Sequence, residues 1–380
     1  MANTLTGLIQ SIYDVVDVVS RELCGFIPSV YKNSKAEQVA KGQDITYPIV
    51  PAATATDITA SNALPALSDT SYENDTMAIS KVRGVRFHWT GDDQLSLESG
   101  TKEALQNNKF SQAFRTLANE MEGDLGGLYT KASRAYGTAG STPFATAGDF
   151  TDASEIARIL KDNGAPLSQL RLVINTAAGA KIIGKQSQVH MVGSADPLRQ
   201  GLLLDVAGMQ IRESAQVKNH TKGTGASYAV NLLAGYASSS TGIAVDTGSG
   251  TILAGDILAN TTSGRDDNKY VVNTALSAGS LAINKPGLVN AWVDNDTLAV
   301  GNSYAANMAF SADAIHLLTR LPKRPEEGDQ ADDVIVVQDP VSGIFFEIAQ
   351  YKAYRAVIYE VSVAWGVKAA KSAHMALLLG

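Results

Sequence analysis

Apolar residues recur at helical spacing in two stretches of the chain. Near the N-terminus they predict an amphipathic helix, with Leu5, Leu8, Ile12, Val15, Val16 and Val19 on one face. A longer stripe over residues 107–136 predicts the longest helix, with Phe110, Phe114, Leu117, Met121, Leu125, Leu128 and Ala132. Gly123, Gly126 and Gly127 interrupt its middle, and each costs up to ~1 kcal/mol relative to alanine. They indicate either close packing against another backbone or a bend.

Between the two stripes, alternating apolar and polar residues predict strands at 45–49 and within 77–89. In the second strand the apolar face changes sides at Gly84, which is typical of a β-bulge. Residues 52–76 are small and polar with little periodicity. Residues 45–89 therefore predict a long two-stranded arm, which is marginal by itself and needs a neighbour to lie on.

Residues 151–222 mix helical and strand patterns. We expect helices at 154–162 and 176–185, a buried strand at 170–174, and a strand pair at 202–205 and 209–211. This segment therefore predicts a mixed layer of helices and strands.

The residue pattern of the chain changes over residues 223–303. Short alternating runs are separated there by Gly, Ser, Thr, Asn and Asp, which predicts a small antiparallel barrel or sandwich. Mixed patterns then return, with a helix expected at 312–319 and three strands within 334–367. An all-β module inside a layer of helices and strands indicates an insertion, so the fold class is α+β.

Composition excludes several classes of protein. The 31 basic and 38 acidic residues give a net charge of −7, which argues against a free nucleic-acid-binding module. The single cysteine, Cys24, excludes an intrachain disulfide and a cysteine-rich zinc site, and five scattered histidines argue against a histidine metal site. We expect no membrane span, no signal peptide, no cofactor and synthesis in the cytoplasm.

One motif resembles catalytic machinery. Val245-Asp246-Thr247-Gly248-Ser249 resembles the active-site loop of aspartic proteases, in which two aspartates share a proton. The chain holds one copy, so a homodimer would have to supply the second aspartate. The same residues fit a Gly/Ser-rich turn, and that interpretation is favoured.

Other polar features have structural interpretations. Ser29 and Lys32 fit the Ser-x-x-Lys spacing of penicillin-binding enzymes but lack the companion motifs. The pairs Asp266-Asp267 and Asp332-Asp333 fall in polar loops and are expected to be solvated turns. His316 lies in a predicted apolar helix, where a core or interface histidine is the simplest explanation.

The densest basic cluster is Lys81, Arg83 and Arg86, for which we expect contact with an acidic neighbour rather than phosphate. The sequence contains no P-loop, no dinucleotide-binding glycine motif, no nucleophile elbow and no His-Glu-x-x-His. It therefore predicts no catalytic residues and a protein that is not an enzyme.

Three segments, in this order, carry a family resemblance. The first is Ala207-Gly208-Met209-Gln210-Ile211 through His220-Thr221, and the second runs from Gly255-Asp256-Ile257 to Lys285-Pro286-Gly287-Leu288. The third runs from Asn307-Met308-Ala309-Phe310 to Trp365-Gly366. Together they resemble the major capsid proteins of tailed bacteriophages with the HK97-type fold, and among these the P22 coat-protein group.

The resemblance implies an α+β, HK97-like capsid fold with an inserted antiparallel β-barrel domain. It divides the chain into six parts: an N-arm (1–44), the E-loop and its strands (45–100), a peripheral domain with the spine helix (101–150), an axial domain (151–222), the inserted β domain (223–303), and the return of the axial and peripheral domains (304–380).

The resemblance also implies a function. The chain would self-assemble as hexamers and pentamers into an icosahedral phage head that encloses double-stranded DNA and expands from procapsid to capsid. Implied partners are a separate scaffolding protein, a portal protein at one vertex, packaged DNA without sequence-specific contact and, optionally, decoration proteins. The location would be the virion, after assembly in the host bacterial cytoplasm.

Two alternatives remain at the sequence level. One is a non-viral nanocompartment shell of the same fold, and residues 223–303 count against it because such shells usually lack this insertion. The other is the homodimeric aspartic protease, acting through Asp246.

Overall fold

The structure is a computed structural model. It describes residues 24–49, 55, 57–58, 60, 73–96, 101–146, 149–186, 206–326, 328–339 and 342–380. The predicted N-terminal helix, the strand at 202–205 and most of the polar stretch 52–76 lie outside these residues.

Helices form a minor part of the described chain. The α-helices are α2 (Gly91–Ser96), α3 (Thr101–Gly126), α4 (Thr151–Asp162) and α5 (Thr176–Gln186). Short 3-10 helices are η1 (Gly127–Lys131), η2 (Leu167–Gln169), η3 (Ala312–Ala314) and η4 (Ser372–His374). Helices α4 and α5 confirm the helices expected at 154–162 and 176–185.

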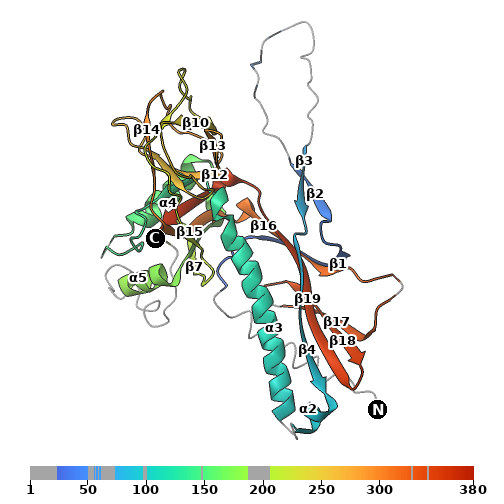
Figure 1. The fold of residues 1–380 in the computed structure, drawn as a ribbon. Coiled ribbons are helices and arrows are strands. Elements are labelled where there is room, and N and C mark those ends of the chain that lie inside the picture. Colours follow the sequence, from blue (N-terminus) through green and yellow to red (C-terminus); the bar gives the residue numbers. More distant parts are fainter. Residues whose placement is uncertain are drawn as a thin grey trace.

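A long sheet lies beside α3 and forms the elongated half of the molecule (Figure 1). Its strands are β1 (Tyr31–Val39), β4 (Lys81–Thr90), β16 (Ile315–Pro322), β17 (Ala331–Gln338), β18 (Phe345–Ala353) and β19 (Ala356–Ala369). The order is β1-β16-β19-β18-β17, and β4 also pairs with β19. Strands β17, β18 and β19 confirm the three strands expected near the C-terminus.

A second sheet occupies the other half. Six of its strands lie beside α4 and α5: β5 (Arg134–Tyr136), β6 (Leu170–Ile174), β7 (Gln210–Glu213), β8 (Asn219–His220), β15 (Tyr304–Ser311) and β20 (Met375–Leu379). Strand β6 confirms the buried strand that the sequence predicted at 170–174. Strand β15 lies between β20 and β6, so chain segments that are distant in sequence meet there.

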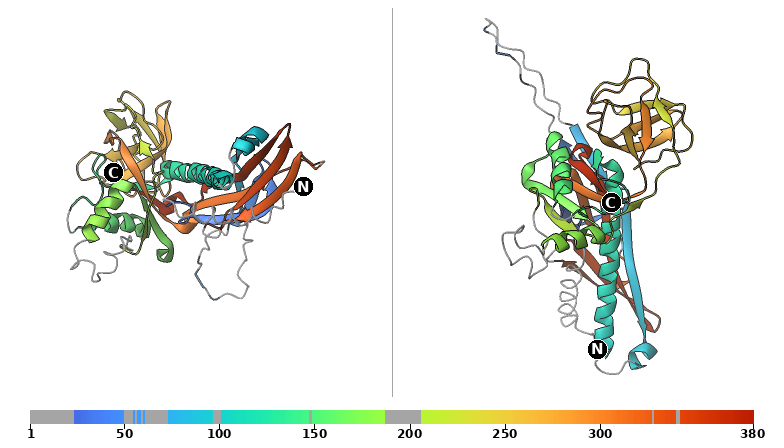
Figure 2. Two further views of the ribbon diagram at one scale, coloured as in Figure 1. Left: turned by 90° about the horizontal axis from the view of Figure 1, so that it is seen from below. Right: turned by 90° about the vertical axis from the view of Figure 1, so that its left-hand side faces the viewer.

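The other six strands of this sheet close on themselves. They are β9 (Tyr228–Val230), β10 (Gly242–Asp246), β11 (Ile257–Asn260), β12 (Lys269–Ser277), β13 (Ser280–Ile283) and β14 (Thr297–Val300). The pairing runs β11-β14-β9-β10-β13-β12, and β12 returns to β11. This six-stranded ring has its own core around Tyr270 and Trp292 and joins the rest of the sheet through the pairing of β12 with β5. In Figure 2 it stands out as a separate rounded body.

Two strands form an arm that joins neither large sheet. Strand β2 (Asp44–Ile49) pairs with β3 (Glu73–Ala78), and together they make a separate two-stranded sheet. The register is regular, from Asp44 opposite Ala78 at the base to Ile49 opposite Glu73 at the far end. Figure 1 shows the arm leaving the body near β1 and β16.

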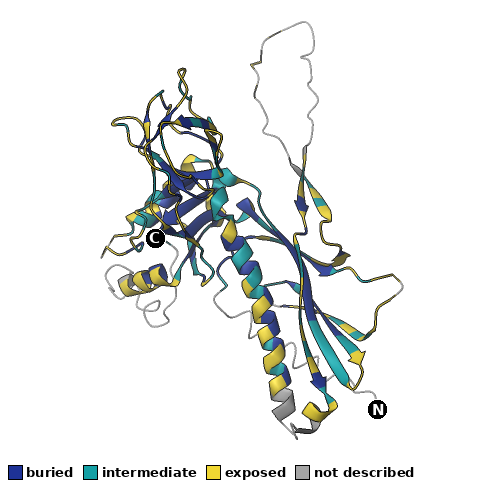
Figure 3. Ribbon diagram, viewed as in Figure 1, coloured by how far each residue is buried: buried dark blue, intermediate teal, exposed yellow. Residues whose placement is uncertain are grey.

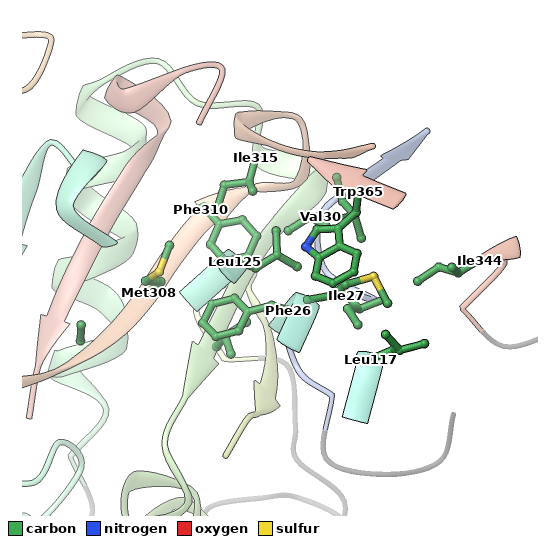
Figure 4. Close-up of a cluster of buried hydrophobic side chains, with 14 of the residues drawn as sticks. Phe26, Ile27, Val30, Leu117, Leu125, Met308, Phe310, Ile315, Ile344 and Trp365 are labelled. Atoms are coloured by element: carbon green, nitrogen blue, oxygen red, sulfur yellow. The ribbon is translucent and has the colours of Figure 1, made fainter. Parts of the chain in front are cut away.

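The main core lies between α3 and the long sheet. The predicted stripe is buried against that sheet, with Phe110, Phe114, Leu117, Met121 and Leu125 each 0–1% exposed. Figure 3 shows the alternation of buried and exposed turns along α3, and Figure 4 shows Leu125 beside the indole of Trp365. The apolar stripe of the sequence therefore identifies the packing face of α3.

The predicted extent of this helix was wrong. We expected residues 107–136, but α3 ends at Gly126, and η1 and β5 follow. Gly126 therefore stands at the end of the helix and not in its middle. A Cβ there would lie 2.7 Å from the carbonyl oxygen of Gln216, which favours close backbone packing over a bend as the reason for this glycine.

The predicted β-bulge at Gly84 and the assignment of β4 to the arm were also wrong. Strand β4 pairs with β19 in unbroken register, from Lys81 opposite Trp365 to Thr90 opposite Ala356. Residues of like parity share a face of a strand, so Lys81 lies on the same face as Phe87. Polar residues continue that face because α3 presents carboxylates to them.

The helix predicted at 312–319 is a strand for most of its length. Only η3 is helical, and β16 begins at Ile315 between β1 and β19. Five consecutive residues of β16, Leu317–Leu321, are buried. Ile315, Leu317 and Leu318 form a short apolar run, and periodicity alone does not distinguish a strand buried on both faces from a buried helix over such a run.

We predict that Gly126→Ala lowers the free energy of unfolding by about 1–3 kcal/mol, because the new methyl group would meet a backbone oxygen that cannot move freely. The adjacent Gly127→Ala is the control. Nothing lies within 4 Å of a Cβ at Gly127, so its free energy of unfolding should stay the same or rise by up to about 1 kcal/mol. Equal values for both variants in urea titrations would contradict the packing explanation.

Candidate assembly site

The arm is attached to the body by a polar latch. The hydroxyl of Tyr47 on β2 donates to Asp75 Oδ2 on β3 over 2.5 Å. Lys368 of β19 forms an ion pair with Asp75 and donates to the carbonyl oxygen of Thr76 over 2.7 Å. Burial alone would raise the pKa of Asp75, but the hydrogen bonds from Lys368 and Tyr47 hold it below its usual value. The latch therefore joins both arm strands to the long sheet through an ionised carboxylate.

A cavity of about 470 Å³ opens beside this latch, between the arm and strands β1 and β16. The ring of His316 lies against Tyr31 and Tyr47, with centroid distances of 5.0 and 5.4 Å. Burial lowers the pKa of His316, which favours the neutral imidazole. His316 thus lines a pocket at the arm's base, and the sequence missed this role because it placed His316 in a helix.

The basic cluster contacts acidic residues, as the sequence predicted, and they belong to the same chain. Lys81 Nζ lies 2.8 Å from Asp124 Oδ1 and 3.3 Å from Glu120 Oε1, both on α3. Arg83 Nε lies 3.1 Å from the same Glu120 oxygen. The hydrogen bond to Asp124 is the largest of several contacts that raise the pKa of Lys81. These pairs fix β4 against the C-terminal half of α3.

A buried carboxylate of α3 holds the start of the described chain. Glu122 is 0% exposed and accepts hydrogen bonds from the backbone N–H groups of Phe26 (3.0 Å) and Ile27 (3.1 Å). The hydroxyl of Ser214 also donates to it over 3.4 Å. Burial raises the pKa of Glu122 to about 7, although these hydrogen bonds oppose the rise. Glu122 therefore connects α3 to the backbone at Phe26–Ile27 and to Ser214, which follows β7.

The ring of strands is connected to the body by a buried polar chain. His220 Nε2 lies 2.8 Å from Asp256 Oδ1, and His220 Nδ1 lies 2.9 Å from the hydroxyl of Tyr129. Asp256 also accepts from the N–H groups of Gly223 (3.0 Å) and Leu253 (2.7 Å). His220 and Asp256 belong to the first two segments of the family resemblance. That resemblance was the one feature of the sequence that pointed to these two residues.

The structure keeps the protease-like residues in a turn. Asp246 is exposed at the end of β10, where it pairs with Ala229 of β9. Thr247 follows with a φ of 58°, and the N–H of Gly248 donates back to the carbonyl oxygen of Asp246 over 2.6 Å. This geometry fits the turn interpretation.

Ser29 and Lys32 do not contact each other through their side chains but have different hydrogen-bond partners. The Ser29 hydroxyl donates to the carbonyl oxygen of Gly25 over 2.6 Å, and Lys32 Nζ donates to that of Ser342 over 2.8 Å. Among the described residues, no cluster of histidine, cysteine and carboxylate side chains could hold a metal ion. No helix in the described ranges is long and apolar enough to cross a membrane.

The prediction of two solvated turns was wrong in part, because Asp332-Asp333 lies within strand β17 and Asp266 of the other pair is buried. Asp266 is 3% exposed and accepts hydrogen bonds from the Tyr270 hydroxyl (2.7 Å) and Trp292 Nε1 (3.1 Å), so its carboxylate organises the core of the ring. Its neighbour Asp267 is exposed, as expected for a turn. Burial of a single member of the pair is a tertiary effect that the local sequence does not encode.

We predict that Asp256→Ala lowers the free energy of unfolding by about 3 kcal/mol or more, because the N–H groups of Gly223 and Leu253 and the ring of His220 lose their shared acceptor. Asp267→Ala, at an exposed position of the ring, is the control and should change the value by less than about 0.5 kcal/mol. Comparable losses in both variants, measured by denaturant titration, would contradict the assignment.

Glu122 predicts a pH dependence of stability. Its raised pKa means that the folded protein binds more protons than the unfolded chain between pH 4.5 and about 7. The free energy of unfolding should therefore fall as pH rises through this window, by on the order of 3 kcal/mol from this group. Glu122→Gln should flatten that slope, whereas Glu120→Gln should retain it. Identical slopes in all three proteins would contradict the prediction.

No protein-family model matches the sequence, and no curated protein matches it. Among solved structures, the capsid structure of the cyanophage P-SCSP1u has a TM-score of 0.51 and 10% identity, over 91% of this chain and 86% of that one. A Mycobacterium phage Che8 structure has a TM-score of 0.44 and 13% identity, over 89% and 85% of the two chains. A virus-like particle from Pyrococcus furiosus has a TM-score of 0.43 and 9% identity, over 98% and 99%. The cyanophage likeness shows the fold alone: this chain has an HK97-like capsid fold that combines helices and strands.

Proposed function

We propose that this chain is the major capsid protein of a tailed bacteriophage, related to the P22 coat-protein group, and that it works by self-assembly and not by catalysis. The observation that carries the proposal is the β2–β3 arm, which forms a two-stranded sheet of its own. The likeness in fold to the cyanophage capsid protein supports it.

The arm gains little from its own chain. A two-stranded hairpin is marginal in water, and apolar contact with the body is concentrated near its base, where Met77 and Ile79 pack against Leu318 and Ala364. The two outer edges of the hairpin present main-chain hydrogen-bonding groups, which a neighbouring chain can pair with. A second copy that covers the arm would supply the missing contacts.

The closed ring supports the P22-group assignment. In this proposal residues 223–303 are the inserted β domain, and the ring joins the axial part through β12 and β5. The remaining segments keep the expected roles, namely the N-arm (1–44), E-loop (45–100), peripheral (101–150), axial (151–222) and returning (304–380) parts. Within the E-loop segment only β2 and β3 form the free arm, because β4 belongs to the long sheet.

The proposed partners follow from this role. Copies of the chain form hexamers and pentamers around a separate scaffolding protein, with a portal protein at one vertex, and the shell expands as DNA enters. A net charge of −7 suits a shell that encloses DNA without reading its sequence.

The first experiment is electron microscopy and sedimentation velocity on the chain, expressed alone and together with the products of the genes that flank its own. Closed shells or sheets of capsomers are expected, and nuclease-protected double-stranded DNA in particles from infected cells would distinguish a phage head from a nanocompartment shell. A stable small dimer with pepstatin-sensitive proteolysis, abolished by Asp246→Asn, would overturn the proposal in favour of the protease.

We predict that replacing residues 50–72 by Asn-Gly blocks shell assembly and leaves the monomer folded. Ile49 lies opposite Glu73, so a two-residue turn can close the shortened hairpin. The free energy of unfolding should change by less than about 1 kcal/mol, because the removed segment lies beyond the paired strands.

The matched control for this deletion is Asp246→Asn, a change at an exposed turn of the ring that should assemble normally. Normal shells from the shortened arm, or an unfolded product, would each contradict the role assigned to the arm.

A further inference from the structure

The cavity at the arm's base is built for an apolar group. Ile45, Met77 and Leu317 contribute aliphatic surface, and the rings of Tyr31 and Tyr47 both lie against the ring of His316. A volume of about 470 Å³ is within the range of sites that bind small ligands and is larger than one side chain requires. The interior therefore suits a short apolar segment of another chain.

The rim of the cavity carries charge. Asp75 is already paired with Lys368, so its charge is compensated within the arm's latch. Lys371 and Asp313 also line the cavity, and both side chains are exposed. A bound segment with an acidic residue next to its apolar residue can therefore form an ion pair with Lys371. Its acidic side chain must then point away from Asp313.

The distal part of the arm offers such a pair. Ile58 is fully exposed, which is unusual for an isoleucine, and Asp57 beside it is also exposed. Residues 50–76 contain Asp57, Asp69, Glu73 and Asp75 and have no lysine or arginine. In polarity and charge, Asp57-Ile58 thus complements the cavity, which has room for Ile58 and its neighbours.

We propose that the cavity at the base of the arm binds the Asp57-Ile58 pair from the arm of a second copy, with Ile58 inside and Asp57 paired with Lys371. This inference rests on the proposed function, since it names the site through which copies would join. Each copy carries one Asp57-Ile58 pair and one cavity, so the contact between two copies is head-to-tail. Repeating it with the same rotation can close the copies into a cyclic oligomer.

The test is site-directed disulfide formation. Ile58→Cys and Thr46→Cys, the latter at an exposed position of the cavity lining, are made separately, mixed, assembled and oxidised. A disulfide-linked dimer that neither variant forms alone is expected. Leu233→Cys, at a 93% exposed position on the ring, replaces Ile58→Cys in the control and should give no dimer with Thr46→Cys.

The outcomes separate the inference from the proposed function. Shells that assemble without the mixed dimer would overturn the inference and leave the capsid function standing. A chain carrying both cysteines that closes only an intrachain disulfide would show that the arm fills its own cavity, which also overturns it. If the parent chain forms no shells under any of the expression conditions, the proposed function fails and the inference fails with it.

A charge exchange gives an independent test. Lys371→Glu should raise the protein concentration needed for assembly, and adding Asp57→Lys should restore it, which a purely structural role of either residue does not predict. Ile58→Asp should raise that concentration about tenfold or more, whereas Ile58→Leu should stay near the parent value. Failure of the exchange to rescue, with shells still forming, would contradict the pairing of Asp57 with Lys371.

Discussion

The packing of one helix face on one sheet is the interaction on which the other parts of this protein depend. Helix α3 buries its apolar stripe against β4 and β19, and aromatic contacts such as Phe87 with Phe110, at a centroid distance of 4.9 Å, fill the interface. In the C-terminal half of α3, carboxylates flank this stripe: Glu120 and Asp124 face Lys81 of β4, and Glu122 is buried against Phe26 and Ser214. The helix therefore combines an apolar face along its length with carboxylates in its C-terminal half.

Those carboxylates determine where the surrounding segments attach. Asp124 accepts from Lys81 of β4 and from the indole N–H of Trp365 on β19, and Glu122 receives the backbone of Phe26. A buried hydrogen bond is directional and costly to leave unmade, so each junction tolerates one arrangement of its partners. The His220–Asp256 pair has the same effect for the ring, which it ties to η1 through Tyr129.

In contrast to these buried junctions, the arm has few contacts with its own chain. Its latch through Asp75 and Lys368 orients the hairpin at the base, while its edges and its exposed Ile58 remain available to other chains. When a rigid core carries a projecting arm with few contacts of its own, association with another copy can stabilise that arm and lower the free energy. In the proposed capsid this difference between a finished core and an unfinished arm would direct assembly.

The sequence by itself determined which segments carry a buried face. The stripe of α3, the helices α4 and α5, the buried strand β6 and the short strands of the ring all follow from local periodicity, because burial on one side leaves a regular trace in the chain. The basic residues of β4 also indicated an acidic neighbour. Only the tertiary structure decided what each face meets. It assigned β4 to β19 instead of the arm, made β16 a strand and set His316 in the cavity. Strand pairing and helix termination depend on residues far away in the sequence, such as Gln216 against Gly126, 90 positions apart, or Val361 opposite Val85, 276 positions apart. Local periodicity carries no record of these contacts.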